Sequence, residues 1–154
     1  MMTQAKDEPN RLDIEELQEK FEKLFETDFI NLDREALRTS KIYFEVQREL
    51  QNQAKSLEYW TQTFAKLMER RRLYYAGRLP KSHYVETPLN FPPQNQTELN
   101  EMLKADQFIQ DCQKYLSEAE RRVKFCEDTL TLVKNRHWDI QNAINYRRMM
   151  EGRS

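Results

Sequence analysis

The feature that most constrains the fold is a long stretch without glycine or proline, residues 33–76. Its apolar residues recur every seven positions, which aligns them along one face of a helix. At about 1.5 Å per residue, such a helix would be roughly 65 Å long. One core row reads Ala36, Tyr43, Leu50, Leu57, Phe64 and Arg71, and the other reads Thr39, Val46, Gln53, Trp60, Leu67 and Tyr74. The pattern predicts one long helix with a seam like that of a coiled coil.

The same seven-residue spacing returns after Glu98 and continues almost to the end of the chain. Every member of this row except His137 is apolar: Met102, Ala105, Ile109, Cys112, Leu116, Ala119, Val123, Cys126, Leu130, Val133, His137, Ile140 and Ile144. A face that stays apolar over so many turns requires one or more partner helices. We therefore interpret residues 98–154 as an oligomerisation region. Its expected contact residues are Ile109, Cys112, Leu116, Val123, Cys126, Leu130, Val133, Ile140 and Ile144.

The remaining segments are shorter. Residues 12–26 carry apolar side chains at three- and four-residue spacing, which predicts a short amphipathic helix. Residues 79–97 hold four of the five prolines and are expected to form a linker, extended at Pro92 and Pro93. The expected divisions are a disordered tail at 1–11, N-terminal helices with a DNA-binding end at 12–78, the linker at 79–97, and the oligomerisation region at 98–154.

These elements predict an all-α fold in which residues 33–76 and 98–150 form a long antiparallel hairpin beside the short helix. Composition agrees, because 38% hydrophobic and 33% charged residues with two glycines favour long helices over a lone compact core. Two helices alone leave much of a heptad face in water, so we expect a homo-oligomer. The pattern leaves open whether the last helix is continuous.

Charge is segregated along the chain. The net charge of −1 excludes a general attraction to nucleic acid or to anionic membranes. Residues 1–35 nevertheless contain eleven acidic and five basic residues, whereas Lys66–Tyr84 contains six basic residues and only Glu69 as an acid. Local binding of an anion is therefore possible in the second region. The acidic first helix is either a protein-docking element or a solvated face.

Residues 70–78 combine positive charge, aromatic rings and an expected helix end at Gly77 and Pro80. Guanidinium groups hold phosphates bidentately, and tyrosine faces stack on unpaired bases, which favours a single strand over a duplex. Tyr74 lies in the seam and is expected to pack, whereas Tyr75 lies beside it and is freer to stack. The expected nucleic-acid contacts are Lys66, Arg70, Arg71, Arg72, Tyr75, Arg78 and Lys81. The alternative is a solvated last turn, where the helix dipole alone favours arginine.

Catalytic and metal-binding patterns are missing from the sequence. It has no glycine-rich phosphate loop, no cysteine and histidine cluster, and no nucleophile beside a base. We therefore expect a protein that is not an enzyme and needs no metal or cofactor. Cys112 and Cys126 would be about 20 Å apart on one helix and cannot form a disulfide. With no signal peptide and no membrane span, the expected location is cytoplasmic.

Several short motifs follow one another in a recognisable order. Tyr74–Arg78 corresponds to a Tyr-Tyr-Ser-Gly-Arg pattern, and Leu17–Phe21 corresponds to Leu-Gln-Glu-Glu-Leu. Residues 100–153 follow the same family's pattern without gaps at Leu103, Ala105, Asp106, Phe125, Cys126, Leu130, Lys134, Arg136, Ile140, Glu151 and Gly152. In this combination the chain resembles the UvsY family, the recombination mediators of T-even-type bacteriophages.

The resemblance implies a non-enzymatic recombination and repair protein that binds single-stranded DNA. It implies contacts with a recombinase and with a single-strand-binding protein. The recombinase replaces the single-strand-binding protein on the strand. It also implies a ring-like homo-oligomer of about six or seven subunits, held by the C-terminal region, in the host cell cytoplasm. The family's basic Lys-Ala-Arg-Leu-Asp segment reads Glu69–Leu73 here, so Arg71 coincides with its arginine while Glu69 replaces its lysine. Arg70 and Arg72 are expected to restore the charge.

Two other classes of protein compete with this interpretation. A coiled-coil scaffold or adaptor that never binds DNA fits the composition and the heptads equally well. It has no use, however, for arginines and tyrosines gathered at one helix end. A helical repressor of duplex DNA fits less well, because no short recognition helix at helix-turn-helix spacing is apparent.

Overall fold

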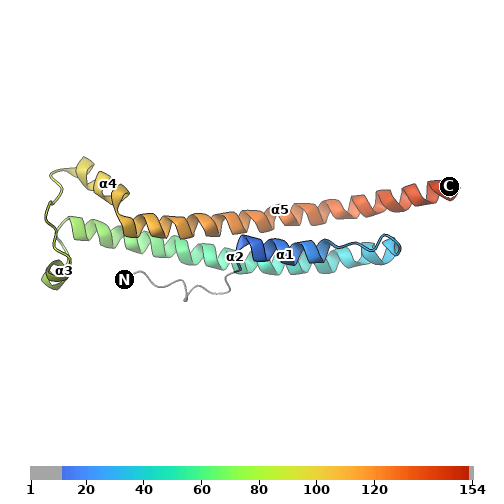
Figure 1. Ribbon diagram of the computed structural model, residues 1–154, viewed down its shortest axis with the longest axis horizontal. Helices are drawn as coiled ribbons and strands as arrows, with labels where there is room; N and C mark the ends of the chain where they lie inside the picture. Colours follow the sequence, from blue (N-terminus) through green and yellow to red (C-terminus); the bar gives the residue numbers. More distant parts are fainter. Residues whose placement is uncertain (1–11, 153–154) are drawn as a thin grey trace. The chain divides into compact units, whose positions relative to one another are not determined.

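The computed structural model describes residues 12–152, which form five helices and no strand (Figure 1). The helices are α1 (Ile14–Phe25), α2 (Leu32–Tyr75), α3 (Lys81–Glu86), α4 (Gln96–Ala105) and α5 (Gln107–Met150). The all-α class, the short first helix and the long helix expected at residues 33–76 are confirmed. The disordered tail expected at residues 1–11 lies outside the described residues.

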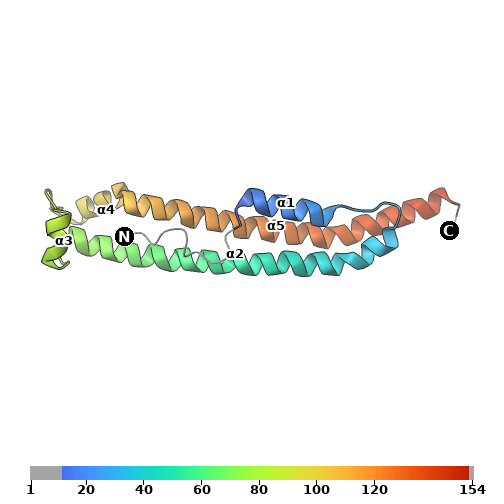
Figure 2. The same ribbon diagram turned by 60° about the horizontal axis from the view of Figure 1, so that its bottom comes forward.

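Contacts divide the described chain into two compact units. The mid-chain unit consists of residues 57–119, and the terminal unit consists of residues 12–56 together with 120–152. Helices α2 and α5 each supply a segment to both units, and within each unit the two segments run antiparallel (Figure 2). Helix α1 belongs to the terminal unit, whereas α3 and α4 belong to the mid-chain unit.

Helix α1 completes the core of the terminal unit. Asp13 caps its N-terminus, since Oδ1 accepts a hydrogen bond from the backbone N–H of Glu16 at 2.8 Å. The ring of Phe21 stacks on that of Phe125, with centroids 5.8 Å apart. The buried cluster draws on three helices and comprises Leu17, Phe21, Ile42, Val46, Cys126 and Val133. The short helix therefore covers apolar surface that two helices alone would leave in water.

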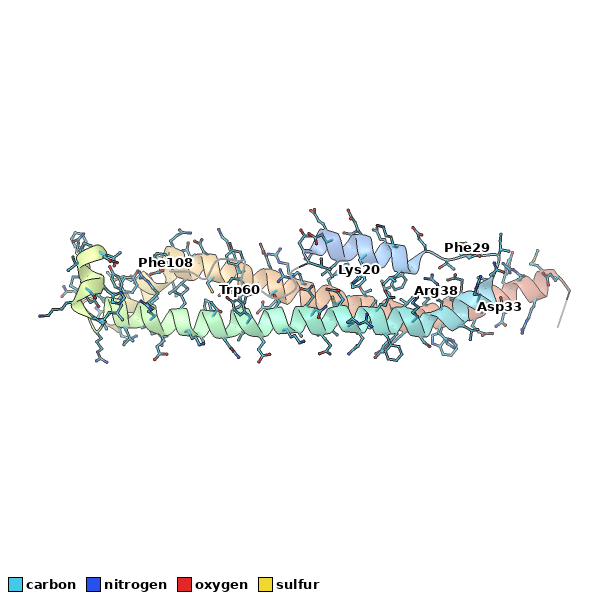
Figure 3. All side chains as sticks on the ribbon, turned by 90° about the horizontal axis from the view of Figure 1, so that it is seen from below. Lys20, Phe29, Asp33, Arg38, Trp60 and Phe108 are labelled. Carbon is cyan, nitrogen blue, oxygen red and sulfur yellow. The ribbon has the colours of Figure 1, made fainter. Side chains whose placement is uncertain are left out.

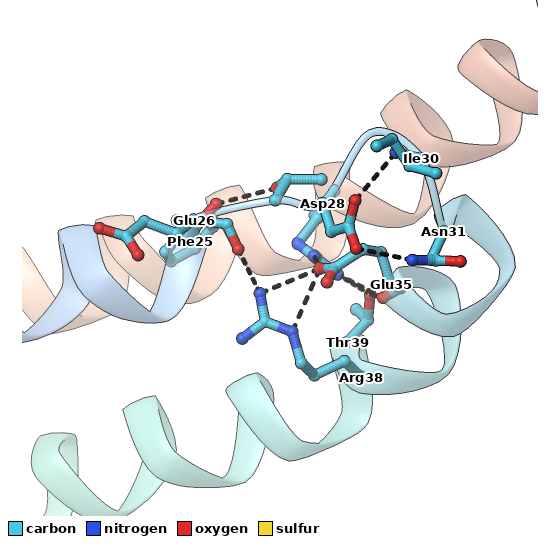
Figure 4. Close-up of polar contacts among 10 residues, drawn as sticks. Phe25, Glu26, Asp28, Ile30, Asn31, Glu35, Arg38 and Thr39 are labelled. Carbon is cyan, nitrogen blue, oxygen red and sulfur yellow. Dashed lines mark hydrogen bonds and ion pairs between the residues drawn. The ribbon is translucent and has the colours of Figure 1, made fainter.

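A buried ion pair joins α2 to α5 in the terminal unit. Arg136 Nη2 donates to Glu35 Oε2 at 2.6 Å, and Arg136 Nη1 donates to Thr39 Oγ1 at 2.6 Å. Arg38 donates to the same carboxylate oxygen from Nε at 3.1 Å and from Nη2 at 2.9 Å (Figure 4). Burial raises the pKa of the Glu35 carboxyl, but the hydrogen bond and charge of Arg38 and the hydrogen bond from Arg136 outweigh it, so this pKa lies below its ordinary value.

The buried face of α2 in the terminal unit is turned relative to the expected seam. The residues expected in one core row are only partly buried there: Ala36, Tyr43 and Leu50. The preceding positions are buried instead: Glu35, Ile42 and Glu49. Glu49 can be buried because it accepts from Lys20 Nζ at 3.0 Å, as Glu35 does from Arg136. A pattern of apolar residues could not predict the burial of Glu35 and Glu49, since each depends on a cation from another helix.

Aromatic stacking organises the core of the mid-chain unit. The ring of Trp60, labelled in Figure 3, stacks on Tyr115 with centroids 4.7 Å apart. Cys112 and Ala119 of α5 are buried in the same cluster. This packing ties the last turns of α2 to the first turns of α5 within the unit.

The structure adds detail to two segments that the sequence described only coarsely. Residues 79–97, expected to be a linker that is extended at Pro92 and Pro93, also contain the six-residue helix α3, of which Pro80 is the N-cap. Proline fits a helix start, where its missing N–H has no intrahelical partner. The expected arm at residues 98–150 is two helices, α4 and α5, separated by Asp106 in an extended conformation.

The described residues also bear on membranes, thiols and metals. Within residues 12–152, no helix is both long and apolar enough to cross a membrane. Cys112 and Cys126 are free and buried, and burial raises the pKa of the Cys126 thiol to about 12. Over the same range of residues, no group of three histidine, cysteine, aspartate or glutamate side chains could hold a metal ion.

The lowered pKa of Glu35 predicts a defined pH dependence of stability. The contribution of this carboxylate to the free energy of unfolding is complete above the ordinary glutamate pKa and is lost as pH falls through the lower folded pKa. We expect Glu35→Gln to be less stable than wild type by about 3 kcal/mol at neutral pH, because Arg136 is left buried without its anion. Its stability should then change less than that of wild type on acidification.

Urea denaturation followed by circular dichroism at a series of pH values measures both effects. Glu58→Gln, at an exposed position of α2, is the matched control and should follow wild type. Equal acid sensitivity of wild type and Glu35→Gln would show that the pair does not carry this linkage.

Candidate nucleic-acid interface

Helix α2 ends where the sequence predicted. Gly77 has φ +71°, in the left-handed region that glycine adopts readily. The backbone N–H of Gly77 donates to Tyr74 O at 3.1 Å, and that of Arg78 donates to Leu73 O at 2.9 Å. These two bonds form the Schellman motif, which satisfies the last carbonyl groups of the helix.

Most of the expected cationic contacts are exposed around this helix end. They are Lys66, Arg70, Arg72, Arg78 and Lys81, which we call the basic surface. None of the five forms an ion pair with another described residue. Contact with a polyanion would therefore break no ion pair between these cations and the part of the chain that the structure describes.

Arg71 is placed differently from its neighbours. Its Nε donates to Asp106 Oδ2 at 2.7 Å, and its side chain is only 19% exposed. Its Cζ lies 4.4 Å from the ring centroid of Tyr74, 5.2 Å from that of Tyr75 and 5.0 Å from that of Phe108. A guanidinium held by one carboxylate and three rings supports the local structure. The structure thus separates Arg71 from the basic surface with which the sequence grouped it.

Asp106 is the residue that the sequence-based interpretation missed. Its carboxylate is 1% exposed, and Oδ2 also accepts from the hydroxyl of Tyr75 at 2.7 Å. Oδ1 accepts from the backbone N–H groups of Phe108 at 2.9 Å and Ile109 at 3.2 Å, which caps α5. We call Asp106, Arg71 and Tyr75 the clasp. An aspartate directly before a helical stretch is a capping signal, but here it falls between two apolar positions of an unbroken heptad row.

The titration of the clasp residues reflects their mutual contacts. Burial raises the pKa of the Asp106 carboxyl, but hydrogen bonds from Tyr75 and Arg71 outweigh this and lower it below the ordinary value. Burial and the hydrogen bond to Asp106 both raise the pKa of the Tyr75 hydroxyl. Asp106 is therefore an anion at neutral pH, and Tyr75 keeps the proton that it donates.

The tyrosines divide between packing and partial exposure. Tyr74 is 8% exposed, and its hydroxyl donates to Thr87 O at 3.0 Å, which confirms that it packs. Tyr84 of α3 stacks on Tyr74 at 5.4 Å and donates to its carbonyl oxygen at 2.8 Å. Tyr75 is partly exposed, as expected, but its hydroxyl is held in the clasp.

The expected oligomerisation residues fall into two groups. Five are buried by the chain itself: Ile109, Cys112, Cys126, Val133 and Ile140. Four are only partly buried: Leu116, Val123, Leu130 and Ile144. Of these, Leu116 and Leu130 pack against the buried clusters of their own chain, whereas Val123 and Ile144 belong to neither cluster. The large apolar side chains that are exposed on α5 are none of these nine: they are Phe108, Leu132, Trp138, Tyr146, Met149 and Met150.

The chain matches a known protein family. Residues 20–153 match a family model described as "Recombination, repair and ssDNA binding protein UvsY". The chain belongs to the UvsY family. The match spans α2, the clasp and α5, so the family assignment rests on nearly the whole chain and agrees with the resemblance seen in its motifs.

A solved UvsY-family structure has the same fold. The crystal structure of the bacteriophage T4 recombination mediator protein UvsY superposes with a TM-score of 0.76 at 20% sequence identity. The similarity covers 90% of this chain and 99% of the T4 chain. No match was found among curated proteins.

The clasp predicts a large effect of a single substitution. Asp106→Ala should lower the free energy of unfolding by about 2–4 kcal/mol, because a helix cap contributes roughly 1 kcal/mol and a hydrogen bond to a charged group roughly 1.5–3 kcal/mol. Chemical denaturation measures the change. Asp111→Ala is the control, since Asp111 accepts a hydrogen bond from Gln107, which lies one turn away on the same helix. Similar losses for both variants would contradict the role of the clasp.

Proposed function

We propose that this protein binds single-stranded DNA through the basic surface at the C-terminal end of α2 and acts as a recombination mediator. The family description supports binding of a single strand. The observation that carries the proposal is the division of the cations: five are exposed and form no ion pair with another described residue, while Arg71 is held by Asp106. A solvated helix end explains exposed arginines but does not explain a clasp that fixes the segment bearing them.

Electrostatics favours a strand at this surface despite the net charge of −1. Asp106 neutralises Arg71, so the region from Lys66 to Tyr84 retains five exposed cations beside the single acid Glu69. Cations at this density concentrate a polyanion locally, while the rest of the chain contributes no attraction. A flexible single strand can bring successive phosphates to residues on one helix end more readily than a rigid duplex.

One copy of this surface would bind a strand weakly in physiological salt, so we propose that several copies act together. The resemblance to the UvsY family implies a ring-like homo-oligomer of about six or seven subunits held by the C-terminal region. The partly buried Val123 and Ile144 support association through α5, because neither belongs to a buried cluster of its own chain. Several surfaces on one assembly share a strand and gain avidity.

The mediator role adds two protein partners to the strand. We propose that the assembly holds DNA covered by single-strand-binding protein and helps a recombinase replace it. Helix α1 is a candidate docking element, because Glu15, Glu16, Glu19 and Glu22 are exposed on it and carry charge opposite to the basic surface.

The dependence of strand affinity on salt tests the basic surface. On single strands each phosphate contact contributes about −0.7 to the slope of log K against log salt. Arg70→Ala, Arg72→Ala and Arg78→Ala combined should reduce the magnitude of the slope by about 2 and slow recombinase assembly on covered strands. Arg71→Ala is the comparison, since it should lower stability while leaving the slope near that of wild type.

Fluorescence anisotropy with a labelled oligonucleotide gives these slopes. If the triple variant binds as wild type does, the assigned surface is wrong. If wild type ignores single strands even at low salt, the coiled-coil scaffold becomes the better account.

Association through α5 is tested by placing charge at two partly buried apolar positions that belong to neither buried cluster. Val123→Lys with Ile144→Lys should reduce the mass in solution to that of a monomer, while helical content is retained because neither side chain belongs to a buried cluster. Sedimentation equilibrium gives the mass. Gln113→Lys with Asn142→Lys adds the same charge at exposed positions of α5 and should leave the assembly intact. An unchanged mass in the first variant would place the interface elsewhere.

A further inference from the structure

A cavity of about 310 Å³ opens beside the end of α2 in the mid-chain unit. One wall is formed by the last residues of the helix and its turn: Tyr75, Ala76 and Gly77. The opposite wall comes from the proline-rich segment and the start of α4: Leu89, Pro92, Pro93, Gln94, Asn95, Gln96 and Leu99. The segment interpreted from sequence as a linker therefore builds a hollow next to the basic surface.

The walls of this cavity are fixed by contacts already formed. The hydroxyl of Tyr75 is bound to Asp106 at 2.7 Å. Asn95 caps α4, since its Oδ1 accepts from the backbone N–H of Glu98 at 2.9 Å, and Glu98 in turn accepts from the backbone N–H of Gln94 at 2.6 Å. A ligand would meet a preformed site and would not have to order it, which lowers the cost of binding.

The chemistry of the cavity fits a flat, partly polar ring. Leucine and proline side chains and a tyrosine supply apolar contact. The exposed side-chain amide of Gln94 can both donate and accept hydrogen bonds, as the edge of a nucleobase requires. The volume lies near the lower end of ligand pockets, which run from roughly 300 to 1,000 Å³. It is large enough for one nucleobase.

The surrounding charge indicates what such a ring is attached to. Arg72 lies one turn before Tyr75 on α2 and so shares its side of the helix. Arg78 directly follows Gly77 of the cavity wall, and both arginines are exposed. A ligand in the cavity would therefore have cations beside it, as a nucleotide in a strand requires for its phosphates.

We propose that this cavity is a base-binding pocket, which takes one unpaired nucleobase of a strand whose phosphates lie on the basic surface. The proposal rests on the proposed function and deepens it. A paired base is unavailable to the pocket, so occupancy selects single-stranded over duplex DNA. Because the walls are apolar and the amide can adapt, the pocket accepts different bases and confers little sequence preference.

Comparing a short oligothymidylate with a chain of abasic residues of equal length tests the pocket in the intact protein. The two ligands carry the same phosphates, so only the base differs. Wild type should bind the oligothymidylate more tightly by roughly 5- to 150-fold, the range expected for one base stacked on an aromatic side chain. Equal affinity for the two ligands would overturn the pocket while leaving backbone binding intact, whereas failure to bind either would overturn the proposed function itself.

Filling the cavity gives an independent test. Ala76→Leu adds bulk at an exposed residue of the wall and removes no cation, so the preference for the oligothymidylate should fall toward one while the salt slope stays unchanged. Ala105→Leu, an exposed alanine of the same unit outside the cavity, should keep the wild-type preference. A preference that survives in Ala76→Leu would overturn the proposed pocket, because the base would then bind elsewhere.

Discussion

The mid-chain unit depends on the hydrogen bonds that the Asp106 carboxylate accepts. The carboxylate accepts four hydrogen bonds, two from the first turn of α5 and two from Arg71 and Tyr75 of α2. A buried anion is tolerated only when its charge and lone pairs are satisfied, and here one cation and three further donors do so. The carboxylate therefore caps α5 and fixes the last turns of α2, while the backbone N–H of the same residue caps α4.

This arrangement explains why neighbouring arginines have different tasks. Arg71 is bound to Asp106 in the clasp, and its guanidinium lies against aromatic rings. Arg70 and Arg72, which flank it in sequence, are exposed. In the proposed function, Arg71 supports the surface that its neighbours use for phosphate contacts. The family assignment rests on the match over residues 20–153 and does not depend on this division of roles.

The sequence predicted the helices well because helix formation and helix ends depend on residues that are close together in the chain. Gly77 and Pro80 marked the end of α2, and the heptads marked both long helices. The sequence left open whether the last helix is continuous, since apolar residues keep their spacing across the break at Asp106. The contacts of Arg136 with Glu35 and of Arg71 with Asp106 join residues 101 and 35 positions apart, which no local pattern can pair. The cavity likewise depends on how a proline-rich segment folds back on a helix end.

Hydrogen–deuterium exchange, compared with and without single-stranded DNA across the whole chain, tests the central claim most directly. The account predicts that added DNA slows exchange in two segments, residues 66–81 with the basic surface and residues 89–99 with the cavity wall, and leaves α1 unchanged. Protection confined to α1 or to the C-terminal turns of α5, with residues 66–81 unaffected, would contradict it.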